Sequence, residues 1–104
     1  MHVQVATYRI AEMSDADFIE ANQEFAGMMT EVPGLLAKIW LKAPNGNVYG
    51  GIYLWRDRQA YEDFVGGELW ASVLADESMF DLESRDFAAM EELTRATQPG
   101  LQVV

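Results

Sequence analysis

The sequence predicts an α+β fold, one antiparallel sheet with helices packed on it, in the element order β-α-β-β-α-β. Three observations predict it. Stretches rich in β-branched and aromatic residues alternate with stretches whose apolar residues recur at helical spacing. Asn45-Gly46, the strongest short signal for a β-hairpin, joins two of the strand-like stretches. The 104 residues suit one domain, 1–104, with 97–104 as a C-terminal arm.

The first strand and the first helix occupy the N-terminal third of the chain. Residues 2–10, HVQVATYRI, are predicted to form a strand because β-branched and aromatic side chains dominate them. Ser14, followed by acidic residues, is expected to cap a helix that ends near Thr30, where Val-Pro-Gly at 32–34 prevents continuation. The stripe at helical spacing in this helix consists of Phe18, Asn22, Phe25 and Met29.

The remaining elements complete a ferredoxin-like pattern. They are a strand at 35–42, a strand at 48–56, a helix capped by Asp57, a helical piece at 68–77, a strand within 79–87 and a last helical turn within 88–96. Gly66-Gly67 separates the two middle helical pieces. The order is that of a split βαβ unit with an added C-terminal helix.

The hairpin register separates two kinds of side chain. With Asn45-Gly46 as a two-residue loop, the pairs on one face are Lys38–Tyr53, Trp40–Gly51, Leu36–Trp55 and Lys42–Tyr49. The other face carries only aliphatic residues and glycine, at positions 35, 37, 39, 41, 48, 50, 52 and 54. We expect Gly51 to leave room for the Trp40 indole or for something stacked on it, and Gly50 to allow close packing on the aliphatic face.

Neither face of this hairpin is polar enough to lie against water, so both are expected to be covered. Helices can cover one face. A second copy of the sheet is the economical cover for the other, which predicts a homodimer through sheet packing. We expect the aliphatic face to form the dimer core and the aromatic face to line a pocket. The alternative is a monomer with exposed aromatic residues.

The composition argues against several classes of function. A net charge of −10 without a basic patch disfavours nucleic acid and anionic membranes as partners. Cysteine is absent, and the one histidine, His2, is expected at the surface, so no metal site is predicted. The chain has no glycine-rich phosphate motif, and no cofactor is predicted. The N-terminus does not read as a signal peptide and no stretch would span a bilayer, which predicts a soluble, cytoplasmic protein.

Two short segments resemble a known family. PGLLAKIW at 33–40, and GGIYLW at 50–55 followed by a helix, are similar to the small YdhR-type monooxygenases of the dimeric α+β barrel superfamily, alongside the antibiotic-biosynthesis monooxygenases. The resemblance extends from the first strand to MFDL at 79–82. It implies ferredoxin-like protomers whose sheets pack face to face, each with a pocket between sheet and helices. It also implies oxygenation of aromatic, polyketide-type substrates without flavin, haem or metal.

The positions that match the family are Lys38, Trp40, Gly50, Gly51 and Tyr53. The chain departs from several catalytic relatives because it has no histidine beyond His2, which leaves the base for proton abstraction unassigned. We predict Lys38, Tyr53 and Asn22 as catalytic residues. The residues predicted to bind substrate are Trp40, Gly51, Trp55, Phe25, Met29, Tyr61 and Trp70.

Each catalytic candidate has a chemical role and a structural alternative. The Lys38 cation would lower the pKa of a substrate phenol or hold its anion, and Tyr53 would donate a hydrogen bond to the same oxygen. Asn22 would hold a carbonyl or an oxygen intermediate. Alternatively, Lys38 extends along the strand to water or pairs with an acid, Tyr53 satisfies a buried carbonyl, and Asn22 binds a backbone group. The tryptophans are open to an interpretation as core or interface packing.

The sequence therefore favours a cofactor-independent monooxygenase that acts on a small aromatic or polyketide-like substrate. Two alternatives stay open: a non-catalytic dimeric module that binds a small hydrophobic ligand, and a cofactor-free isomerase or cyclase in the same pocket.

Overall fold

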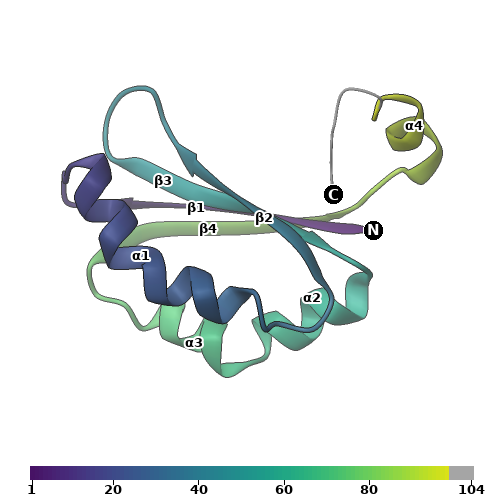
Figure 1. The fold of residues 1–104 in the computed structure, drawn as a ribbon, viewed down its shortest axis with the longest axis horizontal. Coiled ribbons are helices and arrows are strands. Elements are labelled where there is room, and N and C mark those ends of the chain that lie inside the picture. Colours follow the sequence, from purple (N-terminus) through teal and green to yellow (C-terminus); the bar gives the residue numbers. More distant parts are fainter. Residues whose placement is uncertain (99–104) are drawn as a thin grey trace.

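The computed structural model describes residues 1–98 of the chain, and it confirms the predicted element order (Figure 1). Residues 99–104, the greater part of the predicted C-terminal arm, lie outside the described residues. The elements are β1 His2–Ile10, α1 Asp15–Met29, β2 Leu35–Lys42, β3 Val48–Trp55, α2 Arg58–Val65, α3 Glu68–Leu74, β4 Met79–Ala88 and α4 Glu91–Ala96. The predicted bounds of β1 and β2 agree with these residue for residue.

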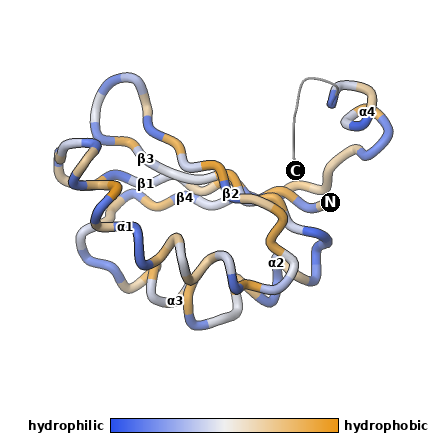
Figure 2. The backbone as a smooth tube through the Cα atoms, in the orientation of Figure 1, coloured by the Kyte–Doolittle hydropathy of each residue, from blue (hydrophilic) through white to orange (hydrophobic). Residues whose placement is uncertain are grey.

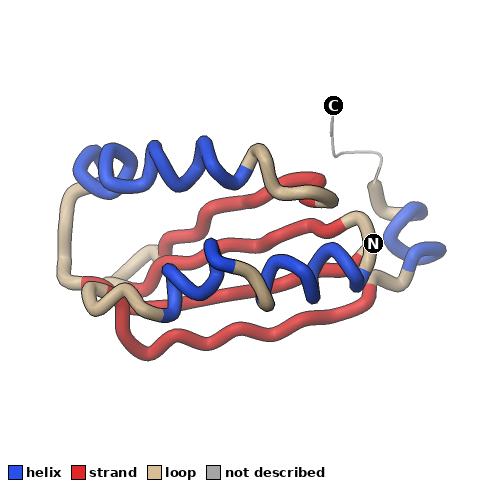
Figure 3. The backbone as a smooth tube through the Cα atoms, turned by 90° about the horizontal axis from the view of Figure 1, so that it is seen from below, coloured by secondary structure: helices blue, strands red, loops and turns tan. Residues whose placement is uncertain are grey.

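The four strands form one antiparallel sheet in the order β2-β3-β1-β4. Figure 1 shows α1, α2 and α3 on one side of this sheet, and α4 beyond the end of β4. Figure 3 views the sheet from the side that carries the helices. In this view α2 and α3 follow one another in a single row, and α1 runs beside them. In Figure 2 these three helices alternate hydrophobic and hydrophilic stretches, as expected for helices with one face on a sheet.

Side-chain caps fix the beginnings of the two helices that start the crossovers. The Ser14 side chain accepts a hydrogen bond of 3.1 Å from the backbone N–H of Asp17. The Asp57 carboxylate accepts one of 2.9 Å from Ala60, which lowers the pKa of Asp57. Between them, Gly34 ends the turn after α1 with φ 81°, a conformation that favours glycine. Both caps are confirmed as predicted.

The hairpin register is confirmed over most of its length. Lys38 pairs with Tyr53, Trp40 with Gly51, and Lys42 with Tyr49. The expected pairing of Leu36 with Trp55 is wrong. The register shifts between positions 35 and 37, so Leu35 lies opposite Trp55 and packs against the core, while the Leu36 side chain is 55% exposed. An irregularity at the start of the strand inserts one residue without changing the pairs farther along.

The aromatic face of the sheet is the face that the helices cover. Tyr53 and Trp55 of β3 are buried against Phe64 of α2 and Trp70 of α3. The Trp55 ring centroid lies 4.9 Å from that of Phe64, and Phe64 lies 5.7 Å from Trp70. This aromatic cluster with its aliphatic neighbours is the core of the protomer.

The aliphatic face has no helix over it. Ile39 on β2 is 48% exposed and Phe87 on β4 is 50% exposed, although both belong to the sheet. Ile52 and Leu54 on β3 are half-buried. The separation of the two faces is thus as the register predicts: the helices take the aromatic face and leave the aliphatic face open.

The adjacent glycines of β3, Gly50 and Gly51, leave space for different neighbouring groups. At Gly50, a Cβ atom would overlap the carbonyl oxygen of Ala6, so the close approach of β1 to β3 requires glycine there. At Gly51, a Cβ atom would lie 2.8 Å from Cε of Lys38. The Lys38 side chain occupies that space, with its Nζ atom 3.6 Å from the Trp40 ring centroid. The room at Gly51 is therefore taken by a group stacked on the indole, as the second of the two expectations has it, and not by the indole itself.

None of the helices within residues 1–98 has the length and apolar character needed to cross a membrane.

Candidate functional site

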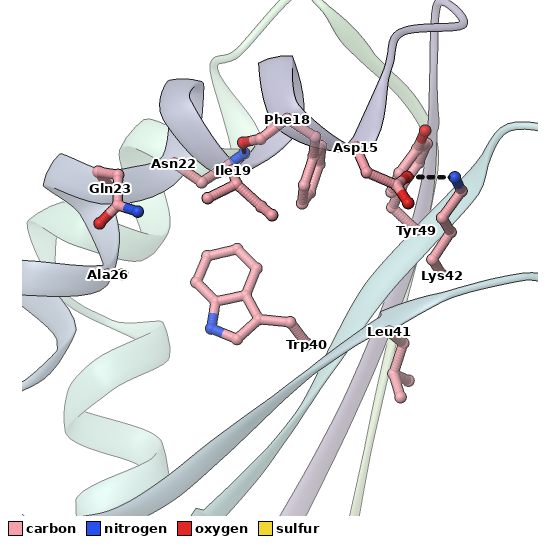
Figure 4. A pocket seen from close by; sticks show the side chains of 10 residues that line it. All are labelled: Asp15, Phe18, Ile19, Asn22, Gln23, Ala26, Trp40, Leu41, Lys42 and Tyr49. Carbon is pink, nitrogen blue, oxygen red and sulfur yellow. Dashed lines mark hydrogen bonds and ion pairs between the residues drawn. The ribbon is translucent and has the colours of Figure 1, made fainter.

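A cavity of about 350 Å³ lies between α1 and the β2–β3 hairpin. Figure 4 shows the Trp40 indole standing up from β2 toward α1, with Phe18 and Tyr49 at the end of the cavity near Lys42. Besides these four residues, the wall includes Asp15, Ile19, Asn22, Gln23 and Ala26. Aromatic and aliphatic side chains with a few polar groups are typical of sites for small organic ligands.

A second cavity, of about 360 Å³, adjoins the first where α1 ends and β2 begins. Met29, Leu35 and Lys38 are among its lining residues. Trp40 and Ala26 line both cavities, so the two meet at the Trp40 indole. A ligand that extends from one cavity into the other would therefore pass Trp40.

Lys38 lies among aromatic rings rather than beside an acid. Its Nζ atom is 3.6 Å from the ring centroid of Trp40, 4.7 Å from that of Tyr53 and 5.0 Å from that of Phe25. These distances allow cation–π attraction from three sides. Burial of the ammonium lowers the pKa of Lys38 from its ordinary 10.5 to about 8. The amine is therefore able to act both as a cation and as a base near neutral pH.

Tyr53 lies opposite Lys38 on the neighbouring strand, β3. Its ring is buried, with its centroid 6.0 Å from that of Trp55 in a stacked arrangement, and burial raises the pKa of its phenol. The phenol thus stays protonated and remains a donor. Across residues 1–98, no side-chain polar atom is both sealed from solvent and unpaired.

The end of the cavity near the hairpin tip is closed by an ion pair. Lys42 on β2 binds the carboxylate of Asp15 at the start of α1, a contact that Figure 4 marks, and this hydrogen bond raises the pKa of Lys42. Beside it the rings of Phe18 and Tyr49 stack with centroids 4.6 Å apart. Phe18 also meets Trp40 edge-on at 6.3 Å. The contact spans the space between the helix and the sheet.

Three predicted residues lie close to this space. Asn22 lines the first cavity, but its amide donates a hydrogen bond of 2.9 Å to the carbonyl oxygen of Phe18 in the same helix. Phe25 contributes its ring to the surroundings of Lys38, and Met29 lines the second cavity. The stripe of α1 therefore supplies one wall of the site.

Other predicted residues lie deeper or farther away. Trp55 is fully buried, and its indole N–H donates to Oε1 of Gln4 at 3.2 Å. Trp70 is buried beside Phe64 in the core. Tyr61 on α2 donates a hydrogen bond of 3.2 Å to Asp86 of β4. These three are not brought to either cavity.

His2 lies in the sheet interior, and the expectation that it is exposed is wrong. The residue is 6% exposed, and its Nε2 atom lies 2.7 Å from Oδ2 of Asp86. The Tyr61 ring covers it, with centroids 5.2 Å apart. The hydrogen bond with His2 lowers the pKa of Asp86. Because β1 and β4 pair antiparallel, residues that are 84 positions apart in the chain meet here.

Among residues 1–98 there is no group of three or more acidic, histidine or cysteine side chains that could hold a metal ion.

The family described as "Putative mono-oxygenase ydhR" matches the chain over residues 3–99. The chain belongs to this family. The match covers every strand and helix of the fold except His2 at the start of β1, so both cavities are built entirely from ydhR-family sequence. The comparison with curated proteins gives no match at a significant level.

Solved structures place the ydhR-family chain among antibiotic-biosynthesis monooxygenase folds. A protein from Deinococcus radiodurans described as a "putative antibiotic biosynthesis monooxygenase" superposes with a TM-score of 0.70 at 13% identity, covering 86% of this chain and 92% of that one. SnoaB from Streptomyces nogalater, a cofactor-independent oxygenase, superposes with a TM-score of 0.63 at 19% identity, covering 85% and 92%. The heme-degrader MhuD from Mycobacterium tuberculosis, with two hemes bound, gives 0.66 at 13%, covering 86% and 96%. At such identities the likeness shows the fold alone.

Sequence reasoning missed several residues that line the first cavity of this ydhR-family chain. Phe18 was placed on the helix stripe and Tyr49 on the aromatic face, but neither was assigned to the site. The signal that could have found Tyr49 was its parity with Gly51 and Tyr53 on β3. No local signal pointed to the pairing of Asp15 with a lysine 27 positions later, because it depends on where α1 lies over the sheet.

Proposed function

We propose that this ydhR-family chain is a cofactor-independent monooxygenase, and that its substrate is a small aromatic or polyketide-like phenol bound between α1 and the sheet. The observation that carries the proposal is the position of Lys38, a half-buried ammonium among three aromatic rings at the edge of a cavity. Among residues 1–98, no carboxylate forms an ion pair with it. A half-buried cation of this kind favours an anionic ligand.

The aromatic walls suit a planar substrate. The Trp40 indole lines both cavities with the Lys38 ammonium 3.6 Å from its ring centroid, so an aromatic ligand beside it would meet an aromatic ring and a cation together. Phe18 and Tyr49 form a stacked pair at the far end of the first cavity. Met29 adds an adaptable apolar side chain to the second. A fused aromatic ligand would thus meet ring faces along its length and a cation at one edge.

The chain's own groups supply proton transfer and charge stabilisation. Neutral Lys38 removes the proton from the substrate phenol, and the ammonium formed holds the phenolate by charge. Tyr53, kept protonated by burial, donates a hydrogen bond toward the same region. The electron-rich phenolate then reduces O₂ directly. For an anthrone, a methylene group and one O₂ become a carbonyl group and one water.

A second copy of the chain is proposed to cover the open face of the sheet. Ile39 and Phe87 are each about half exposed there, although they belong to ordered strands. An exposed apolar patch that includes Phe87, Leu54 and Ile39 favours association over a monomer. The two copies would place their sheets face to face and their helices outward.

A binding module without catalysis is the second candidate, and two contacts favour it. The Asn22 amide donates to its own helix, and the one histidine, His2, is held by Asp86 away from both cavities. A protein that only binds a hydrophobic aromatic compound needs neither group. The isomerase or cyclase alternative requires the same site and the same Lys38.

Oxygen uptake by the purified protein tests the proposal. A panel of hydroxyanthrones, quinols and naphthols is added with a chelator present and no flavin. We expect protein-dependent uptake that falls by about 100-fold or more in Lys38→Met, because the base and the cation are lost together. Tyr53→Phe should lose less, about tenfold, since it removes one hydrogen bond.

Arg58→Met is the matched control, because it also deletes one cation but on the exposed side of α2, where Arg58 pairs with Glu62. Its uptake should equal that of the unchanged protein. Tight binding of the panel compounds without uptake would favour the binding module. Non-oxidative conversion of a panel compound, measured by chromatography, would favour the isomerase or cyclase.

A further inference from the structure

We propose that Lys38 is a covalent capture site for carbonyl compounds: its ε-amine attacks the carbonyl carbon of an aromatic aldehyde or ketone held against Trp40 and forms an imine. This goes beyond oxygenation and does not rest on it, because O₂ takes no part in the step. The ligand class is different as well, a neutral carbonyl compound in place of a phenol.

The geometry supplies the conditions that such an amine needs. Nζ lies within 3.6 to 5.0 Å of three aromatic ring centroids, so apolar groups replace part of its water. Lys38 lines the second cavity, so a ligand there lies beside its side chain. Gly51 leaves the space that the side chain occupies, since a Cβ atom at Gly51 would lie 2.8 Å from Cε. A lysine desolvated in an apolar pocket is a recognised nucleophile toward carbonyl groups.

The side chains around Lys38 are uncharged, and they favour the neutral form of its amine. Phe25 of α1 and Trp40 of β2 do not titrate, and Tyr53 of β3 stays a neutral phenol because burial raises its pKa. Burial alone lowers the pKa of Lys38 to about 8. In the part of the chain that the structure describes, residues 1–98, no carboxylate forms an ion pair with the amine that would oppose this effect.

The step needs only one proton from water besides the amine and the carbonyl compound. The neutral amine adds to the carbonyl carbon, and one proton passes from the nitrogen to the carbonyl oxygen to give a carbinolamine. The hydroxyl group then takes up a proton supplied by water and leaves as a water molecule while the C=N bond forms. The product is a protonated imine, whose positive charge stays among the same three rings.

The chain contains an internal control for this reaction. Its only lysines are Lys38 and Lys42, four positions apart on the same face of β2. Lys42 is exposed and bound to Asp15, which raises its pKa. The two amines therefore differ in surroundings while sharing strand, face and chemistry.

The test uses 2-naphthaldehyde with sodium cyanoborohydride, which reduces an imine to a stable secondary amine. Peptide mapping by mass spectrometry then gives the rate of adduct formation at each amine. At pH 7.5 we expect Lys38 to react about tenfold faster than Lys42, because far more of it is neutral. The rate at Lys38 should rise with pH through about 8. Lys38→Arg, which keeps the charge and removes the nucleophile, should abolish that adduct.

Equal rates at the two lysines would overturn the proposal, as would an adduct confined to Lys42 or to the N-terminus. Absence of any Lys38 adduct in folded protein would overturn it too. Gly51→Ala, which displaces the Lys38 side chain, should lower the rate at Lys38 and leave that at Lys42 unchanged. Oxygen uptake measured on the same preparation keeps this outcome separate from the monooxygenase proposal, since either result stands without the other.

Discussion

The two faces of the sheet are made by alternate residues of the same strands, yet their surroundings are opposite. On β3, Tyr53 and Trp55 are buried beneath α2 and α3, whereas Leu54 between them is half-buried with no helix above it. The covered face carries the rings, the lysines and both cavities. The open face carries the aliphatic residues of β2 and β3, with Phe87, Arg85 and Glu83 of β4 beside them. The covered face thus contains the hydrophobic core and the candidate site, and the open face is available for association with another chain.

The largest effect should come from truncating the covered face. Trp55→Ala removes a fully buried indole and should lower the free energy of unfolding by about 3–5 kcal/mol. Leu54→Ala, one residue earlier and on the open face, is the matched control and should cost about 1 kcal/mol in the monomer. Urea denaturation of both variants measures the difference. Equal losses would show that the two faces are not distinct in packing.

A charge on the open face should break association without unfolding the protomer. Ile39→Asp places a carboxylate in the proposed dimer core and should weaken self-association by about 100-fold. Sedimentation equilibrium measures the dissociation constant, and circular dichroism checks the fold. Ile39→Val, which keeps an aliphatic side chain, should stay dimeric. A parent protein that is monomeric at high concentration would contradict the proposal.

Removing the buried charge on the covered face should stabilise the protein. The pKa of Lys38 is about 8 when folded and 10.5 when unfolded, so the unfolded state binds the proton more tightly. Stability therefore rises as pH increases through about 8. Lys38→Met should add about 2 kcal/mol at pH 7 and remove this rise. Denaturation from pH 7 to about 9.5 measures it, below the range in which tyrosine ionisation would intervene. A parallel pH dependence in Lys38→Met would contradict the assignment.

The smallest effect should come from the helix that forms the outer wall of the site. Ser14→Ala removes the cap of α1 and should cost about 1 kcal/mol of stability. Because Met29 is the one fully buried residue of α1, the loss should concentrate in that helix. Amide hydrogen exchange would show faster exchange in α1 than in α2. Ser14→Asn, which keeps a cap, should behave like the parent.

Local chemistry made most of the fold predictable. Ser14 and Asp57 predict the beginnings of the helices that they cap, and Asn45-Gly46 predicts the hairpin register that separates the two faces of the sheet. The predicted pairing of Leu36 with Trp55 failed. The shift at Leu35 and Leu36 is a backbone irregularity, and no pattern of side chains in the sequence indicates it.

The candidate site was predictable in part. The pairing of Lys38 with Tyr53 follows from the register alone. The occupant of the space over Gly51 does not, because the register brings Trp40 opposite it while Lys38 leans across it. The burial of His2 likewise depends on Asp86, at the far end of the chain. Side-chain direction and long-range contacts of this kind are set by tertiary packing.

The sharing of Trp40 by both cavities has an optical consequence. Of the three tryptophans, Trp55 and Trp70 are 0% and 6% exposed, and only Trp40 is half-buried. The long-wavelength part of the intrinsic fluorescence, and most of its quenching by acrylamide, should therefore come from this one indole. A compound that enters from either side touches the same fluorophore. The protein carries its own reporter of occupancy, and Trp40→Phe would silence it while the buried pair continues to emit.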